Sequence, residues 1–454
     1  MGKYFKQFVQ DVRNEFTLRG FLTCIGAFLF SLSIIGLHNV VQNQFILPIQ
    51  EALDVPRAAV TAWSSWSRIS GIVTATLMGT IYKKLGPRWL AICSGATVTA
   101  GYLVLAYVQP LSLPLLYLAG FSIGIGQAAA GGLMFFTIVK PWWDKAFGTF
   151  AALCGTASGI GGVLFVMTVS KAIVDGGYQA GALKVAILTA IISVIGGLLM
   201  TESPNDALRN EAKLEKAAKA RGEVYKKAEA EKKEGAGGSG VPALGYKDYL
   251  STPITYIIFL IMIMSTFNVA TSLFSPMAKW KGYANPTLVG GAALTAYSAV
   301  LVWTKLGAGA LRDTFGMKVV LPIMYIPAII CISANLFTTV SEDAYKYLCA
   351  LMAFSGTATQ LLVGFVSIQA FGRYFNVKLH GMTVAIFNAA GIFIPPLRHL
   401  PFDMTGSYDI TLMVMLAFAI LSWGLSLVAL KMGRTYQSKM DAKYGLDKAE
   451  AAAS

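Results

Sequence analysis

The segment Gly79-Thr-Ile-Tyr-Lys-Lys-Leu-Gly86-Pro-Arg88 recurs later in the chain as Gly309-Ala-Leu-Arg-Asp-Thr-Phe-Gly316-Met-Lys318. Each copy has a glycine, six further residues, a second glycine and then a basic residue. Each copy also follows the second long apolar segment of its half of the chain. A polar loop repeated at the same place indicates that the chain consists of two similar halves.

The apolar segments predict a membrane protein. The chain has 454 residues, of which 55% are hydrophobic and 13% are charged, whereas a soluble domain carries about 25% charged residues. A run of about 20 apolar residues can cross ~30 Å of hydrocarbon as a helix. Twelve such runs lie at approximately 20–47, 58–82, 89–108, 113–138, 147–170, 179–200, 252–277, 287–311, 317–339, 345–371, 381–400 and 408–430. We therefore expect an all-α membrane protein with twelve transmembrane helices in two pseudo-symmetric six-helix bundles.

A polar stretch separates the two expected bundles. The bundles should occupy 20–200 and 251–431, with a short segment at 1–19 and a tail at 432–454. The linker at 201–250 is rich in Ala, Lys and Glu from Asn205 to Glu234, which favours a solvated helix. The run Gly235-Ala-Gly-Gly-Ser-Gly240 is typical of a flexible connection. The linker is therefore expected to be partly helical.

The distribution of basic residues predicts the orientation in the membrane. If the N-terminus is cytoplasmic, two of the 37 Lys and Arg residues lie deep inside apolar segments and 28 lie in cytoplasmic segments or at their borders. The outer loops then hold Arg57, Lys171, Lys184, Lys279, Lys281, Lys346 and Arg398. Cytoplasmic loops of membrane proteins carry an excess of Lys and Arg. We therefore expect both termini and the linker in the cytoplasm, at the bacterial inner membrane. The net charge of +14 then reflects topology and not a nucleic-acid partner.

Arg68 and Lys305 are the two basic residues that lie six or more residues from both ends of an apolar run, and no acidic residue lies so deep in any of these runs. A charge at the bilayer centre costs at least ~2.5–3.5 kcal/mol and normally faces a wet cavity or a functional site. Arg68 lies eleven residues before Gly79, and Lys305 lies four before Gly309. The difference of about two helical turns places both on the same face of equivalent helices. The pair predicts a site for a small anion at the centre of the protein.

Other polar residues in apolar segments are candidates for orienting that anion. They are His38, Asn39, Gln127, Asn268, Gln360 and Asn388. Each of them could instead form a hydrogen bond between helices, worth ~0.6 kcal/mol. His38 could also carry a proton, because imidazole titrates near neutral pH.

The sequence contains no pattern typical of an enzyme or an ATP-driven pump. It has no phosphate-binding loop, no dinucleotide-binding glycine pattern, and no paired nucleophile and base. The five cysteines lie in apolar segments without the spacing of metal ligands. We expect neither a metal nor a cofactor, and a chain that functions as a monomer.

The repeated loop resembles the G-x-x-x-D-R-x-G-R-R motif of the major facilitator superfamily, and the likeness covers nearly the whole chain. The second copy keeps the acidic position as Asp313, whereas the first has Lys83. The resemblance implies gating or structural roles for six residues of the two loops. They are Gly79, Gly86, Arg88, Gly309, Asp313 and Gly316.

Three further features resemble the oxalate:formate antiporter and monocarboxylate transporter branch of that superfamily. They are Leu250-Ser-Thr-Pro253, Asp403-Met-Thr-Gly-Ser-Tyr408, and Lys305 at the place of the branch's carboxylate-binding arginine. The branch's second basic residue falls at Phe387, which indicates a site altered for another anion.

The resemblance implies exchange of an organic carboxylate for a counter-anion across the bilayer by alternating access. One alternative is proton-coupled monocarboxylate symport. Another, of a different class, is a sensor that signals through the 201–250 loop.

Overall fold

The computed structural model describes residues 12–130, 135–143, 150, 153–206, 209–210, 213, 244–375 and 377–444. Most of the helix expected at 205–234 and all of the run 235–240 lie outside these ranges. Every regular element within the ranges is a helix.

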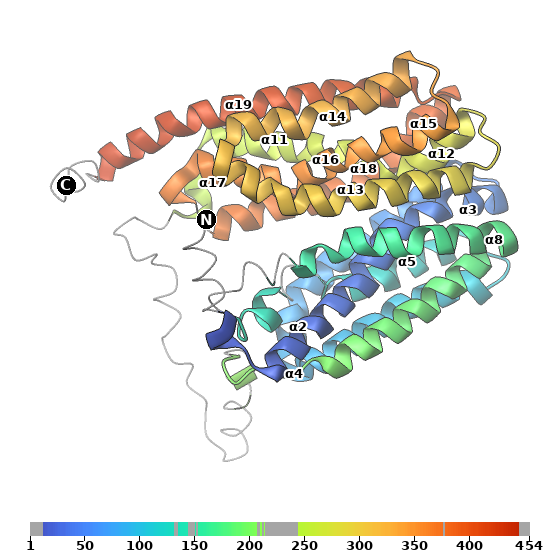
Figure 1. Cartoon of the computed structure of the whole chain (residues 1–454), viewed down its shortest axis with the longest axis horizontal. Helices are drawn as coiled ribbons and strands as arrows, with labels where there is room; N and C mark the ends of the chain where they lie inside the picture. Colours follow the sequence, from blue (N-terminus) through green and yellow to red (C-terminus); the bar gives the residue numbers. More distant parts are fainter. Residues whose placement is uncertain are drawn as a thin grey trace.

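The first half of the chain forms one bundle of helices (Figure 1). Its elements are α2 (Leu18–Ser31), η1 (Leu32–Asn39), η2 (Gln42–Phe45), α3 (Ile46–Leu53), α4 (Arg57–Tyr107), α5 (Leu113–Gln127), η3 (Phe135–Val139) and α8 (Ala157–Leu199).

The second half forms a similar bundle. Its elements are α10 (Tyr246–Leu250), α11 (Pro253–Asn268), η5 (Thr271–Leu273), α12 (Phe274–Trp280), α13 (Pro286–Phe315), α14 (Met317–Phe337), α15 (Glu342–Leu348), η6 (Cys349–Leu351), α16 (Met352–Thr357), η7 (Ala358–Leu362), α17 (Val363–Phe371), η8 (Gly372–Tyr374), α18 (Val377–Thr405) and α19 (Asp409–Tyr444).

Glycines in left-handed backbone conformations reverse the chain between crossings. Within the described residues, nine helical stretches are long and apolar enough to span a membrane. Two of them, containing α4 and α8, turn back at Gly86 (φ +73°) and Gly177 (φ +75°). Glycine adopts this conformation without steric cost. Each of these two stretches therefore makes two crossings, and the shorter apolar helix α5 makes one more. The fold has the twelve expected crossings.

The two bundles contact each other through the helix pairs α4–α18 and α8–α13. At one end of the molecule α3 also meets α12, and the carboxylate of Glu51 pairs with Lys279 at 2.5 Å (Figure 1). We call this end the closed face. The start of α2, the end of α8 and the end of α19 lie at the opposite end, which we call the linker face. There the ribbons of the two bundles diverge, with α2 and α17 well apart in Figure 1.

The last two helices are longer than the sequence predicts. α18 continues to Thr405, five residues past the expected end, and α19 continues to Tyr444. The expected tail at 432–454 therefore begins as a helix. Polar contacts hold this extension: Gln437 donates to the carbonyl of Gln369 at 2.8 Å, and Asp441 pairs with Arg373 at 3.0 Å. Hydrophobicity alone cannot show where such a helix ends.

Candidate functional site

A cavity of about 600 Å³ lies between the two bundles. Sites for small molecules typically measure about 300–1,000 Å³. Elements η1, η2, α4, α5 and α8 of the first half line it, together with α11, η5, α13, η7 and α18 of the second. Both η1 and η7 are π-helices, which occur frequently at functional sites. The position and lining identify this cavity as the candidate site.

Arg68 lies in the wall of the cavity and reaches across to the other half. It shares a face of α4 with Thr61 and Ser64, because residues spaced by three, four and seven positions align on a helix. Its guanidinium lies 3.5 Å from the Oδ1 atom of Asn388 and 5.2 Å from the ring centroid of Phe387, both on α18. The halves therefore meet directly at Arg68.

Lys305 lies in the wall formed by α8 and α13. Its ammonium donates a hydrogen bond to the Ser158 hydroxyl of α8 at 2.9 Å. The side chain of Lys305 thus also crosses from one half to the other. Arg68 and Lys305 both line the cavity, as their positions in the repeat predict.

Arg398 is a third basic residue in the cavity wall, where the sequence prediction of an outer-loop position was wrong. Because α18 runs to Thr405, Arg398 lies about two turns inside the helix and is only 5% exposed. Its guanidinium donates to the Ser272 hydroxyl at 3.1 Å and to the Thr266 carbonyl at 2.9 Å. A basic residue seven positions after Gly391, on the same helix face, was the available signal.

The positive charge of the cavity has no acidic counterpart among the described residues that line it. Arg68 and Arg398 both line this cavity, where like charges disfavour each other. Burying unpaired charge is costly unless a partner of opposite sign arrives. The cavity is therefore electrostatically suited to an anion.

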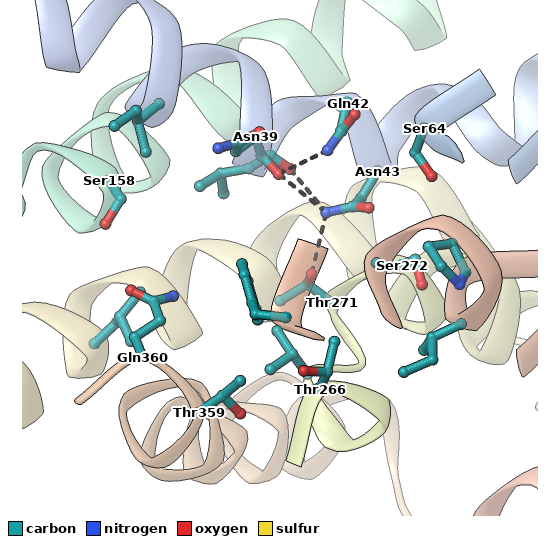
Figure 2. A pocket seen from close by; sticks show the side chains of 18 of the residues that line it. Asn39, Gln42, Asn43, Ser64, Ser158, Thr266, Thr271, Ser272, Thr359 and Gln360 are labelled. Atoms are coloured by element: carbon teal, nitrogen blue, oxygen red, sulfur yellow. Dashed lines mark hydrogen bonds between the residues drawn. The ribbon is translucent and has the colours of Figure 1, made fainter. Parts of the chain in front are cut away.

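Amide and hydroxyl groups also line the cavity (Figure 2). Gln127 accepts from the Ser67 hydroxyl at 2.9 Å and donates to the side-chain oxygen of Asn39 at 2.5 Å. Asn43 donates to the Thr271 hydroxyl of the second half at 3.2 Å. Gln360 of η7 is exposed toward the cavity. These groups can donate or accept hydrogen bonds from a ligand of mixed polarity.

Three of the sequence candidates are not part of the cavity lining. Asn388 contacts Arg68 behind it, as described above, whereas His38 and Asn268 lie further away. His38 is 1% exposed, and its Nδ1 atom is 2.6 Å from the Tyr102 hydroxyl inside the first bundle. Asn268 is also 1% exposed, and its amide fits the Met415 carbonyl and the Ala419 amide of α19 at 3.0 and 3.1 Å. Both positions favour hydrogen bonding between helices over contact with a ligand.

His38 is not the only imidazole buried in the membrane region. His399 of α18 is fully buried, and its Nδ1 atom is 2.9 Å from the Tyr408 hydroxyl. Neither imidazole lines the cavity. Within the described residues, no group of three or more His, Cys, Asp and Glu side chains could hold a metal ion.

A sequence model for the Major Facilitator Superfamily matches residues 20–391, which is most of the chain. The chain belongs to the major facilitator superfamily. This superfamily consists of membrane transporters, so the protein is a multi-pass integral membrane protein that handles a small molecule.

Solved structures of major facilitator transporters share the fold. A bacterial homologue of the human lysosomal transporter Spinster, in an inward-facing and unoccupied conformation, is 12% identical with a TM-score of 0.64. That match covers 93% of this chain and 98% of the other. The nucleoside transporter NupG is 15% identical with a TM-score of 0.61, covering 92% and 99% of the two chains. At these identities the likeness shows the fold alone. Among curated proteins, no significant match was found.

The two superfamily loops differ in what surrounds them. In the first, Lys83 replaces the usual acidic residue, and the residues that follow α8 supply carboxylates instead. The Asp206 carboxylate accepts from the Tyr82 hydroxyl at 2.5 Å, while Arg209 donates to the Lys83 carbonyl and pairs with Glu202. The start of the linker therefore fastens to the first loop.

Glu202 is held ionised in this cluster. Burial acts to raise the pKa of its carboxyl, but hydrogen bonds from Arg209 and Lys213 outweigh burial, so the pKa is lowered. A Cβ atom on Gly86 would lie only 2.9 Å from Oε1 of Glu202. Both the left-handed backbone and the close approach of the carboxylate favour glycine at this position.

The remaining loop residues have varied surroundings. Arg88 lies 3.5 Å from the Leu198 carbonyl, and Gly316 has φ +71° between α13 and α14. A Cβ atom on Gly79 or Gly309 would meet no atom of the described residues within 4 Å, apart from its chain neighbours and its own helix backbone. The side chain of Asp313 lies outside the described residues.

Proposed function

We propose that this superfamily member is a secondary active transporter of organic carboxylate anions. The observation that carries the proposal is the convergence of Arg68 and Lys305, from different halves, on one cavity with no acidic residue in its described lining. A carboxylate would neutralise part of this charge and accept charge-assisted hydrogen bonds from it. The resemblance of Leu250–Pro253 and Asp403–Tyr408 to the oxalate:formate branch supports the same class of substrate.

We propose further that the transporter works by exchange of one anion for another. Transport in this fold requires rocking of the two halves about the central site. Rocking with an empty cavity would enclose unpaired cations, whereas rocking with a bound anion would enclose a more neutral site. Because desolvating unpaired charge is costly, the loaded protein should change state more readily. Neither buried imidazole lines the cavity, which favours exchange over proton symport.

The linker face is proposed to be cytoplasmic, because the basic residues of the chain concentrate there. The described cavity would then open inward. An impermeant maleimide applied to intact cells should label a cysteine at Ser112, on the closed face, and spare one at Lys247. Labelling of Lys247→Cys alone would invert the orientation.

Reconstituted vesicles test the mode of transport. Vesicles preloaded with unlabelled carboxylate should take up labelled carboxylate much faster than empty vesicles. An inward proton gradient should change the rate little. Accumulation into empty vesicles driven by the proton gradient would establish symport instead. Binding without any flux would indicate a sensor.

A further inference from the structure

The basic residues of the cavity are divided between two walls. Arg68 and Arg398 belong to the wall formed by α4 and α18, where Arg68 lies against Phe387 and Gly391 of α18. Lys305 belongs to the wall formed by α8 and α13. These walls are the two main helix–helix contacts between the halves.

Hydrogen-bond partners show that the two groups of charge lie at different places in the cavity. Ser158 accepts from Lys305, and Ser272 accepts from Arg398. Figure 2 shows these two serines at opposite sides of the pocket, with Asn43 and Thr271 between them. The cavity therefore has a cationic group at each of two ends.

The guanidinium end is not saturated by the protein. Arg398 uses its two terminal nitrogens on Ser272 and Thr266, but its buried Nε atom has no hydrogen-bond partner among the described residues. Within the same residues, Arg68 has only the long 3.5 Å contact to Asn388 as a side-chain acceptor. Buried donors without acceptors are rare in folded proteins. An oxygen-rich anionic group at this end would provide the missing acceptors.

Apolar side chains also line the cavity. Leu301, Ile394 and Phe387 line it together with the amides of Asn39 and Gln127. A small compact anion would leave much of this apolar lining without contacts. A chain of several carbons would contact more of it.

We infer that the cavity binds an elongated organic anion with two separated carboxylates, one held by Arg68 and Arg398 and the other by Lys305. The inference rests on the proposed function and specifies its substrate class. The ammonium end forms a point contact, whereas the guanidinium end can grip a carboxylate through several parallel N–H donors. A ligand with a single carboxylate should therefore bind at the guanidinium end.

Matched ligands test the inference by calorimetry on the purified full-length protein. Succinate, glutarate and adipate are each compared with the monoamide in which one carboxylate is replaced by a neutral amide of the same size. At the best length, the dicarboxylate should bind about tenfold tighter or more, because hydrogen bonds to charged groups are the stronger ones. In Lys305→Gln this ratio should fall to about one, while the affinity for the monoamide changes little.

Two further variants keep the test decisive. Lys346→Gln removes a partly exposed lysine of α15 that lies outside the cavity and pairs with Glu342 and Asp343, and it should behave as wild type. Ser158→Ala frees the Lys305 ammonium and should preserve or raise the preference for dicarboxylates. If Lys305→Gln does not fold, the ratio of dicarboxylate to monoamide affinity in the wild type and in Ser158→Ala still tests the inference.

The outcomes separate the two proposals. Equal affinity for dicarboxylate and monoamide in the wild type, at every length, would overturn the inference but leave a carboxylate transporter. A loss of monoamide affinity in Lys305→Gln equal to that of the dicarboxylate would also overturn it. Absence of binding by every carboxylate would overturn the proposed function itself.

Discussion

Asp403 connects the two halves at the closed face, and its removal should open that face more often. Its carboxylate accepts hydrogen bonds from the backbone N–H groups of Arg57 at 3.1 Å and Ala58 at 2.8 Å. These are the first N–H groups of α4, whose N-cap residue is Pro56 and has no side-chain acceptor. The second half therefore caps a helix of the first half, and only while the closed face stays closed.

The side chain of Arg57 strengthens this contact. It is 3% exposed, lies 3.8 Å from the ring centroid of Phe402, and donates to the Tyr408 hydroxyl at 3.0 Å. When the closed face opens, these interactions between halves must separate. Together they favour the state that the structure shows.

The size of the expected shift between the two states follows from the free energy of the helix cap. Loss of an N-cap acceptor costs about 0.5–2 kcal/mol, typically about 1 kcal/mol. Asp403→Ala should destabilise only the state in which the closed face is closed, because the cap exists only in that state. The ratio of the open to the closed state should therefore rise about fivefold, within a range of roughly 2- to 30-fold. Solvent exposure of Asp403 places the expected value toward the lower part of that range.

Spin labels at Ser112 and Ala284, on closed-face loops of the two halves, measure this ratio by pulsed electron resonance. The population at long distances should grow in Asp403→Ala. Asp409→Ala is the matched control, because the Asp409 carboxylate accepts from Ser407 of its own half at 2.7 Å. An unchanged distance distribution in Asp403→Ala, or an equal change in the control, would refute the reasoning.

Three further predictions concern the cavity and the linker. Gly391→Ala places a Cβ atom 3.1 Å from the Nε atom of Arg68; overpacking costs about 1–3 kcal/mol, so carboxylate affinity should fall about fivefold or more by calorimetry. In Gly381→Ala of the same helix, the new Cβ atom would meet no other part of the described residues within 4 Å beyond its own helix, so affinity should stay unchanged. Lys305→Arg keeps the positive charge and should retain exchange in vesicles, with a shifted preference among anions. Folding lowers the pKa of Glu202, so the ionised carboxylate stabilises the protein above the ordinary pKa of about 4.3, and this stabilisation is lost as the pH falls through the folded value. The melting temperatures of the wild type and Glu202→Gln should therefore converge in that acidic range. A constant difference down to pH 3 would contradict this.

The architecture could be predicted from sequence because each membrane crossing requires a long apolar run. The repeated loops mark equivalent turns, and Gly86 and Gly316 indeed have left-handed backbones there. The ends of α18 and α19 could not be placed, since polar contacts and not hydrophobicity extend them.

The candidate site could be predicted in part. Arg68 and Lys305 were recognisable because a charge in an apolar segment is costly wherever it lies, and a cavity relieves that cost. A neutral polar residue gives no such signal, because it can form its hydrogen bonds with a neighbouring helix. Asn268 and Gln360 look alike in sequence, yet only Gln360 lines the cavity. Arg398 was missed because the predicted end of its helix lay too close to it.

The central claim is that Arg68 and Lys305 bind the transported carboxylate, and counterflow in reconstituted vesicles tests it most directly. Uptake of labelled dicarboxylate into vesicles loaded with the unlabelled compound is compared for the wild type, Arg68→Ala, Lys305→Ala and the surface variant Lys346→Gln. Circular dichroism and size-exclusion profiles establish that all four are folded. We predict rapid counterflow for the wild type and Lys346→Gln, and loss of nearly all counterflow for both alanine variants. Wild-type rates in both alanine variants would contradict the claim.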